Sequence, residues 1–240
     1  MLHEVFGDYG AGKSAFLTYQ IKNLYLNHGD EKLAFCKSMI AQINLKRQKK
    51  LSYPKKPPIY ANFDVTITKP DGTVFKPHRI DGEDIGLNLP NGETNYKYFP
   101  PGSAIFIDEA QNYFNSKGDI KREVAAFFEQ HRHNYLDIWL ATQRGILINK
   151  DIRGICKDFK QILSLENETS IFGSITQTTW HVKEFTEKYE FEKYLDTDGA
   201  DDCKCDVITY VNKGNIFDCY DSHSYITKFM PPEGKNFNVF

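Results

Sequence analysis

The sequence predicts an α/β protein in which helices flank a mainly parallel central sheet. Continuous apolar runs at residues 103–107 and 136–142 are typical of strands that are buried on both faces. Helical spacing of apolar residues begins at Ser14 and returns at residues 120–134. Because strands alternate with helices along the chain, an open parallel sheet is the simplest topology.

The composition is that of a folded protein. Of 240 residues, 40% are hydrophobic and 26% are charged, close to the average for globular domains. The 30 Lys and Arg residues nearly balance the 32 Asp and Glu residues, so any binding of nucleic acid must be local. Five scattered cysteines predict a reducing compartment without disulfides. We expect neither a signal peptide nor a membrane span, because no apolar run approaches about 18 residues.

The elements follow one another in a simple order. Residues 2–6 are expected to form a strand, and the helix from Ser14 is expected to end at Gly29. A second helix from Asp30 would end before the prolines at 54–58, and a hairpin is expected around the turn at 69–72. A further strand is expected at 161–165. We divide the chain into a core of residues 1–166, with a hairpin and loop insertion at 59–102, and a β-containing appendage of residues 167–240 packed on it.

A phosphate-binding loop lies between the first strand and the first helix. The segment Gly7-Asp8-Tyr9-Gly10-Ala11-Gly12-Lys13-Ser14 matches the pattern GxxxxGK[ST] in full. Its glycines let the backbone N–H groups turn inward around phosphate oxygens, and the helix N-terminus adds free donors. Lys13 would reach the β and γ phosphates of ATP, and the Ser14 hydroxyl would bind Mg²⁺.

Two acids follow the buried strand at 103–107. Ligands of parallel sheets bind beyond the carboxyl ends of strands, so Asp108 would emerge beside the phosphate loop and bind Mg²⁺. Glu109 would polarise the water that attacks the γ phosphate, which favours hydrolysis over binding alone.

Polar residues also follow the strand at 136–142. Gln143 could contact both the γ phosphate and the attacking water, or it could simply be a polar cap of the strand. Arg144 and Arg153 are candidates for an arginine finger that acts across a subunit interface. The residues alone do not decide between these two arginines.

These segments resemble the zonula occludens toxin family, which includes the filamentous-phage assembly ATPases. The resemblance rests on the phosphate loop and on the segment 107–153, with Ile107-Asp108-Glu109-Ala110-Gln111, His131-Arg132-His133, Thr142-Gln143 and Asp151-Ile152-Arg153. Tyr60-Ala61-Asn62 and Tyr220-Asp221-Ser222-His223 are also similar to the family's pattern. The family is similar in turn to the additional-strand P-loop motors, which include viral packaging and chromosome-pumping ATPases.

The resemblance implies a ring-forming ATPase, with a hexamer as one ring size, that uses ATP and Mg²⁺. In it, Glu109 would activate water, Gln143 would sense the γ phosphate, and Arg153 would reach the nucleotide of a neighbouring subunit. Phage DNA and coat or capsid proteins are the implied partners, in the host cytoplasm or at the cytoplasmic face of the inner membrane. The implied function is a phage morphogenesis motor that couples Mg-ATP hydrolysis to virion assembly and export of phage DNA.

The sequence is also consistent with other functions. Family members usually continue into a transmembrane segment and a periplasmic tail, whereas this sequence ends at Phe240 with neither. We therefore expect either a cytoplasmic fragment or a soluble member, and the second option favours a viral genome-packaging ATPase that moves DNA into a capsid. A kinase would need an arginine-rich lid, which we do not see. A nucleotide-dependent switch or scaffold with slow turnover is the remaining alternative.

The sequence contains three weaker signals of function. Six Lys and Arg residues between Lys46 and Lys56 could contact a DNA backbone or an anionic membrane surface, although a solvated helix end is the commoner explanation. The segment 131–133 could contact a neighbouring subunit or DNA, or could be a solvated or capping cluster. The cysteines at 203, 205 and 219 form a poor zinc pattern because they lack a CxxC pair.

Overall fold

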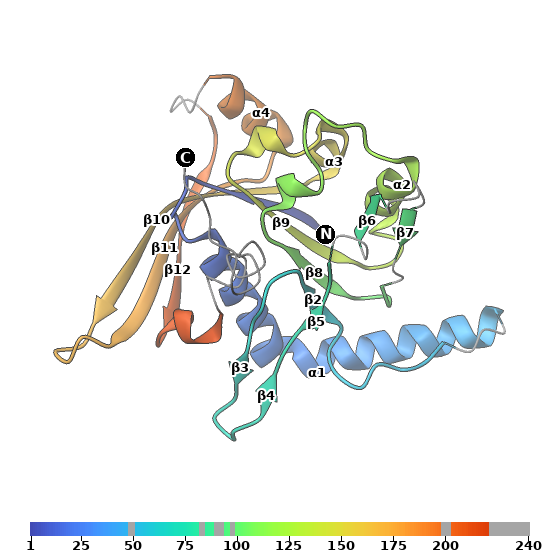
Figure 1. Cartoon of the computed structure of the whole chain (residues 1–240), viewed down its shortest axis with the longest axis horizontal. Helices are drawn as coiled ribbons and strands as arrows, with labels where there is room; N and C mark the ends of the chain where they lie inside the picture. The colour runs from blue at the N-terminus through green and yellow to red at the C-terminus, as the bar shows by residue number, and fades with distance from the viewer. Residues whose placement is uncertain (48–50, 82–84, 89–93, 97–98, 198–202, 221–240) are drawn as a thin grey trace, which may run out of the picture.

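An eight-stranded sheet lies at the centre of the computed structural model, which describes residues 1–47, 51–81, 85–88, 94–96, 99–197 and 203–220 (Figure 1). Its strand order is β12-β11-β10-β1-β9-β8-β2-β5. The strands from β10 to β5 are parallel, whereas β11 and β12 are antiparallel additions beside β10. The bounds are β1 (Leu2–Phe6), β2 (Ile59–Ala61), β5 (His78–Arg79), β8 (Ala104–Ile107), β9 (Asp137–Thr142), β10 (Asp158–Thr169), β11 (Ile175–Phe185) and β12 (Asp206–Lys213).

Helices cover both faces of this sheet, as Figure 1 shows. They are α1 (Lys13–Arg47), α2 (Arg122–Gln130), α3 (Lys150–Ile155) and α4 (Lys188–Asp196). On the α1 face, Phe16 and Val5 belong to one apolar core. On the opposite face, Phe128 and Phe191 join Phe6 in a second core. β1 serves both cores because alternate side chains of a strand point to opposite faces. The predicted fold class, a mainly parallel sheet flanked by helices, is confirmed.

Shorter elements surround the sheet. β3 (Ile67–Thr68) and β4 (Val74–Phe75) form the hairpin predicted around the turn at 69–72, while residues 59–61 join the main sheet instead. A second hairpin pairs β6 (Ile85–Asn88) with β7 (Thr94–Tyr96). The 3₁₀ helices of the described residues are η1 (Ala110–Asn112), η2 (Gly145–Leu147) and η3 (Ile216–Cys219). Within the same ranges, no helix combines the length and apolarity that crossing a bilayer requires.

The two helices predicted before residue 54 are one helix, α1, and the helix predicted over 120–134 is shorter than predicted. The prediction that Gly29 ends a helix is wrong, because α1 continues without a break to Arg47. A Cβ at Gly29 would lie 3.2 Å from the Tyr25 ring and 3.5 Å from Pro57, so this glycine makes room for neighbouring side chains. The helix predicted over 120–134 ends at Gln130 and is followed by turns, in which Tyr135 has a positive φ of 55°.

The residues after 166 extend the central sheet. The predicted domain boundary at 166 falls inside β10, and β11 and β12 continue the same sheet from there. The acidic stretch at 184–206 contains α4, a helix that the sequence did not predict. α4 is held by Phe191, whose ring stacks on that of Phe159 at a centroid distance of 3.9 Å. The division into a core and an appendage stays a prediction.

Candidate nucleotide site

The strand order brings the predicted site residues to one edge of the sheet. β9 lies between β1 and β8 and is parallel to both, so the carboxyl ends of these three strands are neighbours. The phosphate loop follows β1, the acid pair follows β8, and Gln143 follows β9. Because ligands of open α/β sheets bind beyond such strand ends, three distant parts of the chain meet where a ligand would bind.

The backbone of the phosphate loop requires glycine. Gly12 has a φ of +87°, and a Cβ there would lie 2.3 Å from Cδ1 of Leu165 on β10. A Cβ at Gly7 would lie 2.8 Å from the carbonyl oxygen of Ile162 on the same strand. The Trp180 ring also donates a hydrogen bond of 3.4 Å to the Gly12 carbonyl. The loop is therefore held in its curled form by close packing against β10 and β11.

Lys13 lies across this loop. Its Nζ donates hydrogen bonds of 2.9 Å to the carbonyl oxygens of Gly7 and Asp8. Burial lowers the pKa of Lys13, and the nearby carboxylates of Glu109 and Asp108 oppose that effect. The ammonium group is thus held on the loop, close enough to the acid pair for the charges of Glu109 and Asp108 to act on it.

Ser14 and Asp108 form the closest contact between the loop and the acidic strand. Ser14 Oγ donates a hydrogen bond of 2.5 Å to Asp108 Oδ2. Burial raises the pKa of Asp108, and the Ser14 hydrogen bond opposes this shift. A hydroxyl and a carboxylate are oxygen ligands, and Mg²⁺ takes few protein ligands when substrate phosphates supply the rest. Ser14 and Asp108 therefore fit a magnesium ion bound together with ATP.

Glu109 is oriented by two glutamine side chains. Its backbone is left-handed, with φ 49° and ψ 43°, at the start of η1. Gln143 Nε2 lies 3.5 Å from Glu109 Oε2, and Gln111 Nε2 donates to the same oxygen. Gln143 was predicted to lie here, whereas the sequence indicated Gln111 only as part of the family motif. The left-handed backbone of Glu109 turns the chain so that the Gln111 side chain reaches the Glu109 carboxylate. The sequence pattern does not predict this turn.

Asn62 and Tyr220 also lie beside Asp108. Asn62 is buried at the end of β2, where its side chain accepts a 2.7 Å hydrogen bond from the Asp108 N–H and donates a 2.9 Å bond to the Asp108 carbonyl. The pKa of Tyr220 is raised to about 12 by burial and by the Asp108 charge. Both residues appeared in the sequence only as parts of the family resemblance. The remainder of the Tyr220 motif, residues 221–223, lies outside the described residues.

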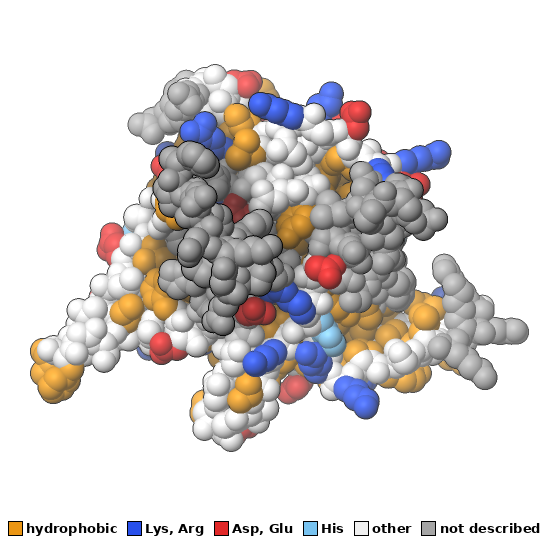
Figure 2. All heavy atoms as spheres, in the orientation of Figure 1, with side chains coloured by type: hydrophobic (Ala, Val, Ile, Leu, Met, Phe, Trp, Pro, Cys, Tyr) orange, Lys and Arg blue, Asp and Glu red, His pale blue; other side chains and the backbone are white. Residues whose placement is uncertain are grey.

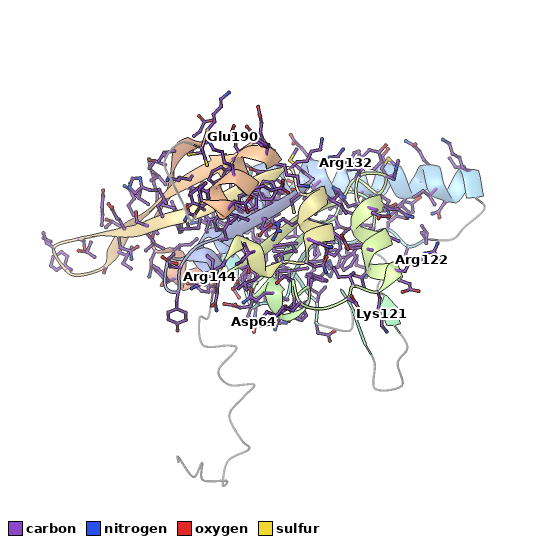
Figure 3. The ribbon with its side chains drawn as sticks, turned by 90° about the horizontal axis from the view of Figure 1, so that it is seen from above. Asp64, Lys121, Arg122, Arg132, Arg144 and Glu190 are labelled. Carbon is purple, nitrogen blue, oxygen red and sulfur yellow. The ribbon has the colours of Figure 1, made fainter. Side chains whose placement is uncertain are left out.

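Arg153 faces its own chain in this structure. From α3, its Nη1 donates a 3.3 Å hydrogen bond to the carbonyl of Gly145, two residues after Gln143. Its charge also acts on Glu4, a buried residue of β1 whose carboxyl oxygens have no hydrogen-bond partner among the described residues. The Arg144 side chain is exposed. In Figure 3 it lies well apart from Arg122, which is the first residue of α2. The choice of Arg153 as a finger stays a prediction.

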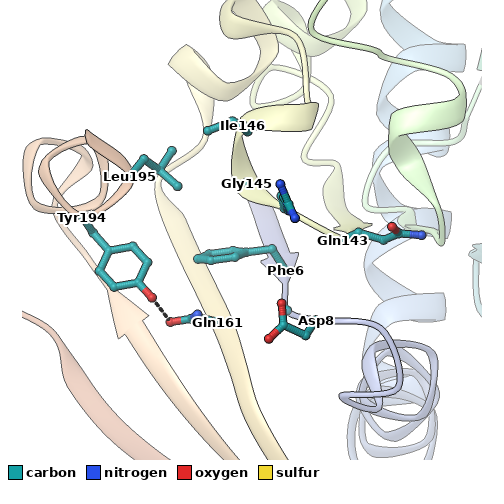
Figure 4. A pocket seen from close by; sticks show the side chains of 10 residues that line it. Phe6, Asp8, Gln143, Gly145, Ile146, Gln161, Tyr194 and Leu195 are labelled. Atoms are coloured by element: carbon teal, nitrogen blue, oxygen red, sulfur yellow. Dashed lines mark hydrogen bonds between the residues drawn. The ribbon is translucent and has the colours of Figure 1, made fainter. Parts of the chain in front are cut away.

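A cavity of about 420 Å³ opens beside the first residues of the phosphate loop (Figure 4). We call it the edge pocket; its lining side chains include Phe6, Asp8, Gln143, Ile146, Tyr194 and Leu195. Tyr194 Oη donates a hydrogen bond of 2.7 Å to Gln161 on β10, which fixes one wall. The pocket thus lies between the phosphate loop, Gln143 and side chains of η2 and α4.

The weaker sequence signals have mixed outcomes. His131 is buried, and its ring bonds to the Phe128 carbonyl at the end of α2, which is the capping arrangement. Lys46 is exposed at the end of α1, and the lysines at 49 and 50 lie outside the described residues. Among the residues that the structure describes, no three His, Cys, Asp or Glu side chains are grouped to hold a metal ion, and residue 223 lies outside that set.

Comparisons with known proteins bear on the family. The model of the family described as Zonular occludens toxin (Zot) matches residues 75–224. The N-terminal domain of zonular occludens toxin from Neisseria meningitidis is similar in structure, with 15% identity and a TM-score of 0.46 over 92% of this chain and 98% of that chain. The genome packaging NTPase B204 from Sulfolobus turreted icosahedral virus 2, in complex with ATP-gammaS, has 11% identity and a TM-score of 0.35 over 90% of this chain and 97% of that chain. No curated protein sequence matches the chain.

The family match covers more than half of the chain. It includes the acid pair, Gln143 and Arg153, which carry the most specific part of the resemblance seen in the sequence. The chain therefore belongs to the zonular occludens toxin family.

Proposed function

We propose that this protein is an ATPase of phage morphogenesis that couples Mg-ATP hydrolysis to virion assembly and export of phage DNA. The observation that supports this most is the 2.5 Å contact between Ser14 Oγ and Asp108 Oδ2, because it joins the phosphate loop to the acidic strand. Lys13 and Glu109 lie at the same sheet edge. Family membership supports the setting in phage assembly.

Binding of ATP would use groups that the fold already orients. The N–H groups of the phosphate loop and of the first turn of α1 would bind phosphate oxygens, and Lys13 would contact the β and γ phosphates. Ser14 and Asp108 would hold Mg²⁺, which neutralises phosphate charge when it is bound. Burial of Asp108 makes its carboxylate dependent on such cationic partners.

Hydrolysis would depend on Glu109. Both donors described for this side chain reach Oε2, which leaves Oε1 to accept a proton from the attacking water. Gln143 lies beside that carboxylate and would orient the water against the γ phosphate. A nucleotide switch would not need such a base, so this arrangement favours turnover.

Phosphate release from Mg-ATP, measured without an acceptor, tests the proposal. We expect release by the wild type, stimulation by single-stranded or duplex DNA, and no release by Lys13→Ala. Lys37→Ala is the matched control, since Lys37 is exposed on the outer part of the same helix. Stimulation by duplex DNA alone would favour genome packaging. ATP binding without release would contradict hydrolysis and favour a switch, and release only with a phosphate acceptor would indicate a kinase.

A further inference from the structure

Strand β1 carries a fully buried acid, Glu4. Figure 2 shows Lys, Arg, Asp and Glu side chains on the surface of the molecule, whereas Glu4 has no exposed area. Both of its carboxyl oxygens lack a hydrogen-bond partner among the described residues. Its register partners on β10 and β9, Phe159 and Leu140, are apolar and also buried. Because buried polar groups are nearly always hydrogen-bonded, a buried acid in such surroundings calls for a functional explanation.

The turn that follows Gln143 packs against Glu4. A Cβ at Gly145, the first residue of η2, would lie 3.5 Å from Glu4 Oε1 and 2.7 Å from Cζ of Phe191. Gly145 is buried and lies two residues after Gln143 (Figure 4). The turn is closed by a hydrogen bond of 3.0 Å from Leu147 N to the Arg144 carbonyl. Close packing on β1 and α4 leaves this turn little room, so a change beneath it is passed on to Gln143.

Arg153 connects the turn with the acid. Its Nη1 donates a hydrogen bond of 3.3 Å to the Gly145 carbonyl, and its charge acts on Glu4. Among the described residues, the other group that interacts electrostatically with Glu4 is the Cys156 thiol, and burial raises the pKa of that thiol, which keeps it neutral. The neighbouring side chain from α4 is the uncharged ring of Phe191. Arg153 is therefore the cation that an ionised Glu4 would attract.

We propose that Arg153 acts within its own chain as a positioning residue, because its bond to Gly145 holds the turn that carries Gln143. When Glu4 loses its proton, its carboxylate would draw the guanidinium away from Gly145 and release the turn. This role rests on the proposed function, in which Gln143 orients the attacking water. It differs from that of an arginine finger, which reaches the nucleotide of a neighbouring subunit.

A pH dependence of kcat follows from this arrangement. Burial raises the pKa of Glu4 to about 8, although the Arg153 charge opposes the shift. At pH 7 the carboxyl group is neutral and the turn is held, whereas at pH 9 about 90% of the carboxyl groups are charged. The wild-type kcat should accordingly fall about tenfold from pH 7 to pH 9 through Glu4 alone. Loss of the Lys13 proton at high pH would lower kcat in every variant, so the comparison with Glu4→Gln isolates the contribution of Glu4.

Steady-state phosphate release at these two pH values tests the response. The ratio of kcat at pH 7 to kcat at pH 9 should be about tenfold larger for the wild type than for Glu4→Gln, with a similar KM for ATP, because no phosphate contact changes. Glu129→Gln, at an exposed residue of α2, is the matched control and should keep the wild-type ratio. Arg153→Gln should lower kcat at pH 7 by about tenfold or more. Equal ratios for the wild type and Glu4→Gln would overturn the inference.

Mixing two variants separates action within the chain from an arginine finger. Arg153→Gln retains Glu109, and Glu109→Gln retains Arg153. If Arg153 reached a neighbour's nucleotide, some interfaces in the mixture would combine both intact groups, and phosphate release would exceed that of either variant alone. We expect no gain on mixing, because neither chain holds both groups. A gain would assign Arg153 to the neighbouring site and overturn its role within the chain.

Hydrogen exchange of residues 143–147 measures the turn without ATP. After correction for the intrinsic pH dependence of exchange, we expect faster exchange at pH 9 than at pH 7 in the wild type but not in Glu4→Gln. Exchange in the buried strand β8 serves as the reference for overall stability. A turn that responds to Glu4 in a protein without ATPase activity would refute the proposed function alone. An active protein whose turn is equally protected at both pH values would refute this inference alone.

Discussion

Replacement of the buried carboxyl group of Glu4 by an amide should make the protein more stable at high pH. Glu4 lies on β1 beside Gly145, fully buried, and both of its oxygens lack a hydrogen-bond partner among the described residues. Burial raises the pKa of Glu4 from 4.5 to about 8, and the Arg153 charge offsets only part of this effect. The folded protein therefore holds a proton there that the unfolded chain loses.

The size of the effect follows from that difference in pKa. Between pH 4.5 and pH 8, the unfolded chain releases the proton while the folded protein retains it, so stability falls as the pH rises. At about 1.4 kcal/mol for each pH unit, the loss reaches about 5 kcal/mol at pH 8. A glutamine has no proton to lose. Glu4→Gln should therefore raise the Tm at pH 8.5 by about 10–20 °C and change it little at pH 4.5.

Thermal unfolding followed by circular dichroism at these two pH values measures the effect. Glu129→Gln, at an exposed residue of α2, is the control and should change neither Tm. An equal gain at both pH values would mean that Gln simply packs better than Glu. No gain at pH 8.5 would show that Glu4 is charged in the folded protein, and the reasoning from its burial would be refuted.

Three other substitutions test the surroundings of the site. Gln111→Leu should lower kcat about tenfold with an unchanged KM for ATP, because it removes a donor to Glu109 and no phosphate contact. Steady-state kinetics measures both constants, and a change in KM with an unchanged kcat would contradict this role. Asn62→Ala leaves the buried N–H and carbonyl of Asp108 without partners, and urea unfolding should show a loss of about 2–4 kcal/mol. His3 loses some basicity through burial, but hydrogen bonds to Asp137 and Asp158 leave its pKa raised above 6.5. His3→Asn should therefore cost more stability at pH 5 than at pH 9 in urea unfolding, and equal costs would contradict this.

Contiguous motifs were predictable from the sequence. The phosphate loop and the acid pair lie within short segments whose flanking strands are visible as apolar runs, so their place at the sheet edge followed from simple rules. The role of Gln143 was harder to predict, because it depends on β9 lying between β1 and β8. The run at 136–142 indicated a strand, but only the structure gives its neighbours.

Residues that act through tertiary contacts were not predictable from the pattern. Asn62 supports Asp108 across 46 positions of sequence, and Gln111 reaches Glu109 only because Glu109 adopts a left-handed conformation. Glycine has a low helix propensity, but packing of Tyr25 and Pro57 against Gly29 outweighs this disadvantage. Helix α4 lies in an acidic stretch and depends on Phe191 being buried by partners far away in sequence.

The comparison of ATP binding with ATP cleavage in Glu109→Gln tests the central claim most directly. The claim is that Glu109 activates water for a nucleotide held by Lys13, Ser14 and Asp108. At saturating Mg-ATP, single-turnover phosphate release should fall at least about 100-fold, since a general base contributes that much or more. The affinity for Mg-ATP should stay within about threefold, because no phosphate contact is assigned to this side chain. Undiminished release with normal binding would contradict the account.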